Sequence, residues 1–423
     1  MRSAFYISIL IFCMAPGIRS FAQEKTDGWL QDLIFKNASP LLKNVLLHPD
    51  SFHYQLIYTK IERDKHNHPH FQNFYYRYNP NDYFNPASTV KMPLAFLALE
   101  KMNGLKNYGI DKYTPMLTDS AYSGQSSVWY DSSSVNGLPS LAHYIKKIFL
   151  VSDNDAYNRL YEFLGQKQIN ERLWQMGYSD VRITRRFVPM TEEENRHTNP
   201  IRFVSNGQLL YQQPPASSDL SFHFPAPILV GRAHLDRNDS LVNSPMDFTT
   251  HNNISLLDLQ QILQSALFPE SLSPEKRFHL SSEDDSFLLR VMSEYPYESL
   301  HPHYDTSEYF QSYAKFFMFK SGRTAIPSYI RIFNKPGWSY GYLTDVAYIV
   351  DFKNKVEFML SAVIYVNSDG VLNDNKYEYD EIGYPFFKEV GNIMYQYELG
   401  RKRKYKPELS RFVIDYREEK GRE

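Results

Sequence analysis

Ser88 and Lys91 are the residues of this sequence best suited to nucleophilic chemistry. Asn85 and Pro86 favour the start of a helix predicted over residues 85–102, so Ser88 falls in its first turn. Lys91 shares one helix face with Ser88, and a neutral amine there can take the proton of the hydroxyl. The backbone N–H of Ser88, free in a first turn, can face a developing oxyanion. The alternative is an ordinary exposed Ser and Lys on a helix.

Ser152-Asp153-Asn154 is a second candidate group. It lies between two predicted helices, at residues 140–149 and 156–163, where a hydroxyl and an amide can project into a cleft. The alternative is that Asp153 or Asn154 caps the helix that follows, and both interpretations can hold together.

A third group, Lys335-Pro336-Gly337, ends a predicted strand. A lysine on an edge strand can supply positive charge for a substrate carboxylate, and Gly337 leaves room for a substrate to lie against the strand. The N–H of Trp338 can complete an oxyanion hole with that of Ser88.

Two alternatives to this third group remain open. The segment Lys335-Pro336-Gly337 can simply be a strand that ends in a Pro-Gly turn. A competing Lys-Ser-Gly stands at 320–322. Lys335 is preferred because the strand pattern on both sides of it is right.

The elements that must position these residues form an α+β pattern. Strands are predicted at 53–61 and 71–78, joined as a hairpin, and at 329–335, 345–352 and 357–366, as antiparallel neighbours. Helices are further predicted at 28–48, 255–267, 284–294 and 381–399. A sheet whose strands come from both ends of the chain must enclose the helical block, a subdomain over about 86–254. Residues 182–254 read as a long loop with an insertion at about 204–248 and a short strand near 228–230.

The three groups, in this order, resemble the active-site set of class A β-lactamases and related penicillin-interacting serine hydrolases. The resemblance extends to residues 84–93, to 151–178 and to 342–350, and covers most of 28–200 and 250–400. It implies a β-lactamase and transpeptidase-like fold, an antiparallel sheet flanked by helices plus a mostly helical subdomain. It also implies acyl transfer through a serine ester, with no metal and no organic cofactor.

The resemblance assigns a part to each residue. Ser88 would be the nucleophile and Lys91 its base or proton relay, while Ser152 would pass the proton to the leaving nitrogen. Asn154 would hold the amide side chain of the substrate, and Lys335 would attract its carboxylate. Asp153 would be structural.

Two departures from the family pattern stand out. Pro336 replaces the usual Thr or Ser, whose hydroxyl also binds the substrate carboxylate. Class A enzymes also place a Glu after the second motif, with an Asn four residues on, to activate the water that cleaves the acyl-enzyme. Here Glu193 or Glu194 could serve, with Asn195 helping to hold the water, although an acidic surface turn is the alternative. Without such a base the acyl-enzyme would persist, as in penicillin-binding proteins.

Composition fits a soluble globular protein, and a small-molecule substrate is what the resemblance implies. The 423 residues are 43% hydrophobic and 22% charged, and the formal net charge of -2 gives no field that favours nucleic acid. His66, His68 and His70 alternate in a predicted hairpin turn, where a surface turn is preferred over a metal site. The run 401–404 opens a charged tail (401–423) and is interpreted as a solvated helix end.

The N-terminus predicts a signal peptide over residues 1–22. Arg2 precedes an apolar run that is too short to span a bilayer, and small residues favour cleavage after Ala22. Lipoprotein processing at Cys13 is the rival, but bulky Phe12 precedes that cysteine. We therefore expect a secreted, periplasmic protein over 23–423 with no cysteine and no membrane span.

Three functions follow as hypotheses. The first is a serine hydrolase that opens a β-lactam or related amide through an acyl-enzyme on Ser88. The second is a penicillin-binding or DD-peptidase-like enzyme that acts on cell-wall peptides. The third is a non-catalytic protein that has kept the fold.

Overall fold

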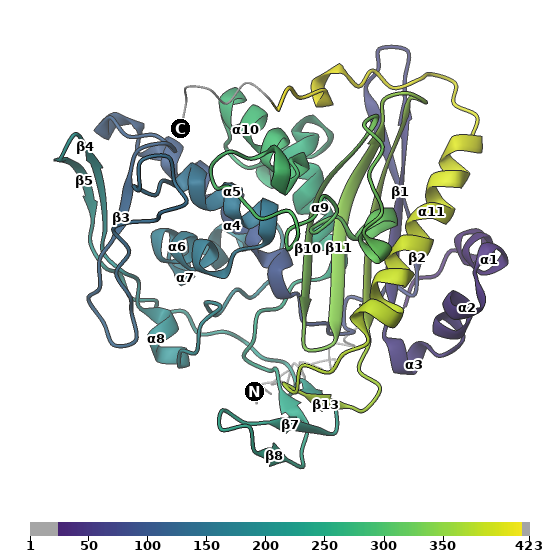
Figure 1. The fold of residues 1–423 in the computed structure, drawn as a ribbon, viewed down its shortest axis with the longest axis horizontal. Helices are drawn as coiled ribbons and strands as arrows, with labels where there is room; N and C mark the ends of the chain where they lie inside the picture. The colour runs from purple at the N-terminus through teal and green to yellow at the C-terminus, as the bar shows by residue number, and fades with distance from the viewer. Residues whose placement is uncertain (1–23, 417–423) are drawn as a thin grey trace, which may run out of the picture.

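A five-stranded antiparallel sheet stands at the centre of the molecule (Figure 1). Its strands, in spatial order, are β10 (Ile330–Ser339), β11 (Tyr342–Asp351), β12 (Val356–Tyr365), β1 (Gln55–Arg63) and β2 (Pro69–Tyr76). The strands come from both ends of the chain and enclose the helical block, as predicted. The last three strands are antiparallel neighbours, which confirms that expectation too.

The computed structural model describes residues 24–416. The predicted signal peptide, with Cys13 and the cleavage site after Ala22, lies outside the described residues. Within 24–416, no helix combines the length and the apolar character needed to cross a bilayer.

Both faces of the sheet are covered, and each packs its own hydrophobic core. Along β11 the side chains alternate: Val346 and Tyr348 enter one core, whereas Ala347 and Ile349 enter the other. One face carries α1 (Gly28–Asn37), α2 (Pro40–Leu47) and α11 (Tyr384–Gly400). The other carries α4 (Lys91–Gly104), α5 (Leu141–Val151), α6 (Asn154–Leu164), α7 (Gln166–Gln175), α9 (Leu256–Leu267) and α10 (Ser282–Ser293). This arrangement confirms the predicted α+β class.

Small strands edge the helical block where the sequence predicted a long loop. Only the strand near 228–230 was expected, and β6 (Leu229–Val230) confirms it. Two further sheets join β3 (Met116–Thr118) to β4 (Ile201–Ser205) and β5 (Gln208–Gln213), and β13 (Val371–Leu372) to β7 (Ala233–Leu235) and β8 (Leu241–Val242). The remaining short elements are α3 (Pro49–Phe52), α8 (Glu192–Arg196) and β9 (Met246–Asp247), which pairs with β6.

Two further sequence expectations need correction. The helix predicted over 28–48 is broken, because the hydroxyl of Ser39 accepts a hydrogen bond from the N–H of Leu42 and so caps a new helix. The run at 401–404 is a solvated helix end only in part, because Lys402 and Lys404 are exposed whereas the two arginines are not. The side chains of Arg401 and Arg403 are only 8% and 11% exposed, and both pair with the buried carboxylate of Glu398.

Candidate active site

Ser88 lies in a tight turn that leads into α4. The side-chain oxygen of Asn85 accepts a hydrogen bond from the N–H of Ala87 at 2.9 Å, and Ala87 has a φ of 44°. A non-glycine residue is strained in that region, and such strain is typical of functional sites. A 3₁₀ turn over Ala87–Val90 follows, so Ser88 precedes the α-helix that Lys91 begins rather than lying in its first turn.

Lys91 is fully buried and points at the turn between α5 and α6. Its ammonium group donates to the side-chain oxygen of Asn154 at 2.6 Å, and also to the carbonyl oxygen of Ser152. The hydroxyl of Ser152 lies 3.4 Å away. Burial lowers the pKa of Lys91 to about 7, although the negative charge of Asp153 opposes the shift. A large fraction of the lysine is therefore neutral near pH 7.

Ser152 is held between two lysines. Its φ of 64° is left-handed and ends α5, while the side chain of Asp153 caps α6 by accepting from the N–H of Ala156 at 2.8 Å. The ammonium group of Lys335 donates to the Ser152 hydroxyl oxygen at 2.9 Å. Because that oxygen accepts from both lysines, its own O–H is left to donate to a third group.

Lys335 comes from the edge strand β10 and is fully buried. Its ammonium group also donates to the carbonyl oxygen of Pro336 at 2.8 Å. Burial, assisted by the positive charge of Lys91, holds the pKa of Lys335 well below its usual range. Lys335 thus makes its bonds inside the protein rather than at an open surface.

The end of β10 lies directly against the turn over residues 85–90, which we call the nucleophile turn after the role predicted for Ser88. A Cβ atom added to Gly337 would come within 2.8 Å of the backbone nitrogen of Ser88. The carbonyl of Pro336 points toward the ammonium group of Lys335. Residues two apart in a strand direct their backbone groups to the same side, so the N–H of Trp338 points the same way as that carbonyl. The N–H groups of Ser88 and Trp338 are therefore neighbours on one side of an edge strand.

A buried polar network that was not predicted from the sequence surrounds Asn334, the neighbour of Lys335 in β10. The side-chain amide of Asn334 donates to both carboxylate oxygens of Asp345, at 2.9 and 3.0 Å. Lys315 donates to the oxygen of the same amide at 2.8 Å. Burial raises the pKa of Asp345 to about 7. The strand pairing of β10 with β11 could have indicated the Asn–Asp contact, but Lys315 belongs to an irregular segment with no such signal.

Glu193 and Glu194 are not brought into this cluster. Glu194 caps its own short helix through Thr191 and also accepts from the hydroxyl of Ser123. The side chain of Glu193 is 63% exposed and contacts His197. Both carboxylates therefore agree with the alternative predicted from the sequence, an acidic surface turn.

Phe187 is the residue of this loop that faces Lys91. Its ring centroid lies 5.0 Å from the Lys91 ammonium nitrogen. Its N–H donates to the side-chain oxygen of Asn158 at 2.8 Å, and the adjacent Arg186 is buried against Glu162. No periodicity in residues 182–254 singles out this phenylalanine.

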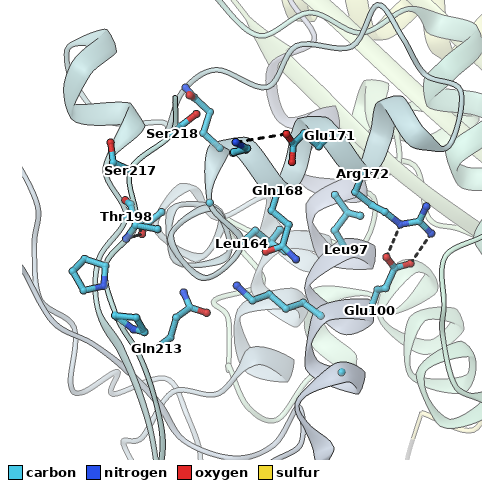
Figure 2. A pocket seen from close by; sticks show the side chains of 18 of the residues that line it. Leu97, Glu100, Leu164, Gln168, Glu171, Arg172, Thr198, Gln213, Ser217 and Ser218 are labelled. Atoms are coloured by element: carbon cyan, nitrogen blue, oxygen red, sulfur yellow. Dashed lines mark hydrogen bonds and ion pairs between the residues drawn. The ribbon is translucent and has the colours of Figure 1, made fainter. Parts of the chain in front are cut away.

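A separate cavity of about 810 Å³ opens at the other end of α4 (Figure 2). Its wall includes Leu97 and an ion pair in which Arg172 donates to Glu100 at 2.7 Å. None of the sequence-predicted site residues lines it.

Comparison with known proteins connects the site with one family. Residues 66–218 match the model of the Beta-lactamase enzyme family, a stretch that includes Ser88, Lys91, Ser152 and Asn154. Lys335 lies beyond it. A search of curated proteins found no match to this chain.

Solved structures of β-lactamases are also similar to the chain. The enzyme of Sphaerobacter thermophilus is 13% identical with a TM-score of 0.46, over 86% of this chain and 97% of that one. For the enzyme of Xanthomonas campestris the identity is 14% and the TM-score 0.47, over the same shares. The chromosome-encoded enzyme of Vibrio parahaemolyticus is 14% identical with a TM-score of 0.46, over 85% and 99%.

The family match covers the stretch where Ser88 and Lys91 stand, and it confirms the resemblance predicted from the sequence. In this stretch the chain resembles the Beta-lactamase enzyme family.

Proposed function

We propose that this chain is a serine hydrolase that opens a β-lactam or a related amide through an acyl-enzyme on Ser88. One observation carries the proposal: Lys91, Ser152 and Lys335 are joined by hydrogen bonds beside the nucleophile turn. A hydroxyl, a partly neutral amine and a second hydroxyl are the groups that such a reaction needs.

The acylation step uses each of these groups once. The Ser88 oxygen attacks the carbonyl carbon, and its proton passes to the neutral amine of Lys91. The N–H groups of Ser88 and Trp338 stabilise the oxyanion. The C–N bond then breaks, and the Ser152 hydroxyl gives its proton to the leaving nitrogen and recovers one from Lys91. Asn154 is exposed at the rim and can bind the amide side chain of the substrate.

The second half of the reaction distinguishes two forms of this function. Release of the acyl group needs a water and a base, and the loop that faces Lys91 presents the ring of Phe187 there rather than a carboxylate. This observation favours a long-lived acyl-enzyme, as in a penicillin-binding enzyme that acts on cell-wall peptides. Lys91 is then the base available for slow hydrolysis.

The test is the intact mass of the protein during incubation with benzylpenicillin. We expect a single adduct on Ser88 that persists for hours in the parent and is absent in Ser88→Ala. An adduct that decays within minutes while penicillin is consumed would contradict the long-lived form and leave a β-lactamase. Equal labelling of Ser88→Ala and the parent would overturn the assignment of the nucleophile.

A further inference from the structure

A row of aromatic rings begins at the residue beside the nucleophile turn. Trp338 follows Gly337 and is half-buried, and its ring lies 6.0 Å from that of Tyr313 at 79°. The ring of Tyr309 lies 4.9 Å from Tyr313, and that of Tyr304 lies 5.2 Å from Tyr309. All four are half-buried, so each ring leaves part of its surface open. We call Tyr304, Tyr309, Tyr313 and Trp338 the aromatic wall.

The charge of Asp153, in the turn that holds Ser152, reaches the far end of the aromatic wall. Burial chiefly raises the pKa of Tyr304 and Tyr309, that of Tyr309 to about 12, and the charge of Asp153 contributes to both shifts. The hydroxyl of Tyr304 is buried, and no hydrogen-bond partner for it exists among the described residues. The wall therefore begins at the residue whose N–H faces the oxyanion, and the turn that holds Ser152 acts electrostatically on its far end.

Lys320 holds the wall in place. Its ammonium nitrogen lies 4.2 Å from the ring centroid of Tyr313 and 5.1 Å from that of Tyr384, and it donates to the carbonyl oxygen of Tyr313 at 2.7 Å. A cation enclosed by rings attracts their faces and fixes their positions. The second Lys-Ser-Gly of the sequence thus supports the wall rather than forming the third active-site group.

The side of the site next to the wall offers little to a charged substrate group. Lys335 is fully buried and bonded to Ser152, and Pro336 has no hydroxyl. The wall itself offers the flat faces of rings, which favour other flat rings through offset or edge contacts.

We infer that the substrate carries an aryl ring on its leaving group and that this ring stacks on the aromatic wall. The inference rests on the proposed function, because it takes Ser88 as the acylated residue and Ser152 as the proton donor to the leaving atom. Tyr309 and Tyr313, in the middle of the wall, are the specificity-determining residues.

Two thioesters test this inference, S-benzyl thioacetate and S-cyclohexylmethyl thioacetate. Both form the same acetyl-enzyme: the bond from the Ser88 oxygen to the acetyl carbon forms, the C–S bond breaks, and the proton leaves with the thiol. Their acylation rates, followed by thiol release, therefore differ only through the leaving group. The ratio of the two rates, compared between variants, removes their intrinsic difference in reactivity.

We expect the benzyl to cyclohexylmethyl ratio to fall by about 2- to 10-fold in Tyr309→Leu and in Tyr313→Leu, the range of single ring contacts. Tyr309→Phe and Tyr313→Phe keep the ring and should keep the ratio, which separates stacking from damage to the fold. Tyr108→Leu removes an exposed tyrosine from the helical block and is the matched control.

The outcomes separate the two proposals. An unchanged ratio in both leucine variants, with Ser88 still acetylated, overturns the aromatic wall as a recognition surface and leaves the proposed function intact. Failure of the parent to acylate Ser88 with either thioester or with benzylpenicillin overturns the proposed function, and this inference with it.

Discussion

If Ser88 is acylated as proposed, the titration of Lys91 decides the pH range of that reaction. Burial lowers the pKa of Lys91 from its ordinary value of 10.5 to about 7, and only the neutral amine can accept a proton. Below pH 7 Lys91 is mostly protonated and cannot accept the proton of Ser88, whereas above pH 7 the neutral amine is available as the base. We expect the acylation rate with benzylpenicillin to rise about tenfold per unit well below pH 7 and to level off above pH 8.

Stopped-flow or quench-and-mass measurement of acylation between pH 5.5 and 9 gives this profile. Lys91→Arg retains a positive charge that does not titrate in this range, and it should reduce acylation by at least about 100-fold at every pH. A flat profile in the parent would show that another group is the base.

Gly337 is required because β10 touches the nucleophile turn. A Cβ atom there would lie 2.8 Å from the nitrogen of Ser88 and 2.9 Å from the carbonyl oxygen of Pro86, and both contacts are with backbone. Gly337→Ala must therefore displace the turn. We expect a loss of roughly 1–3 kcal/mol in the free energy of unfolding, and at least a tenfold slower acylation of Ser88.

Gly104→Ala is the matched control for this change. It adds the same methyl group at the end of α4, where nothing lies within 4 Å. That variant should be as stable as the parent or slightly more stable. If Gly337→Ala unfolds and reacts like Gly104→Ala, then β10 is not in contact with the nucleophile turn in solution.

Among the elements, the turn between α5 and α6 sets the geometry of the site. Asp153 caps α6 through Ala156 and stands between the two residues that contact Lys91. Asp153→Ala should cost about 1 kcal/mol of stability through loss of the cap, and it should slow acylation because the turn frays. Chemical denaturation and the acylation rate measure the two effects.

Asp153→Asn tests the effect of the negative charge separately from the helix cap, because asparagine keeps the cap and removes the charge. Asparagine is an equally good cap, so stability should be kept. The lost negative charge opposed the lowering of the Lys91 pKa, so the midpoint of the pH profile should move down. A midpoint that moves up, or a stability loss equal to that of Asp153→Ala, would contradict this account of the turn.

Patterns within one helix or strand were predictable from the sequence. Contacts that depend on residues far apart in the sequence were not. The sheet followed from runs of β-branched and aromatic residues, and the groups at Lys91 and Ser152 followed from their places at element ends. The strand predicted to end at Lys335-Pro336-Gly337 instead continues to Ser339, still paired with β11. Ser39-Pro40 did carry a helix-start signal that the apolar periodicity of 28–48 masked. The acidic residues of the loop suggested Glu193 or Glu194, although their spacing does not match the family pattern. The loop is anchored by Arg186 on Glu162, and the adjacent Phe187 faces Lys91 instead.

At the scale of the whole molecule, the segment after α11 returns to the helical side of the sheet. Arg401 and Arg403 pair with Glu398, which also accepts from the hydroxyl of Tyr58 in β1. Further along, Leu409 and Phe412 are buried in the core between the sheet and the helical block. The charged composition of this segment therefore conceals two core residues.

Phe412 connects this last segment to the strand that carries Lys335. Its ring lies 5.5 Å from Phe333 in β10 and 4.9 Å from Tyr348 in β11. Phe412→Ala should cost about 3–5 kcal/mol of unfolding free energy, the usual range for a buried phenylalanine. Val413→Ala changes the next residue, which is 65% exposed, and should be nearly neutral.

Because Phe333 lies two residues before Lys335, a cavity at Phe412 loosens the same strand that positions Gly337 beside Ser88. Acylation of Ser88 should therefore slow in Phe412→Ala even at temperatures where the variant is fully folded, and stay unchanged in Val413→Ala. Denaturant unfolding and acylation rates on the same samples check both effects. If Phe412→Ala loses stability but acylates at the parental rate, then β10 is held by its pairing with β11 alone, and the last segment supports the fold without supporting the site.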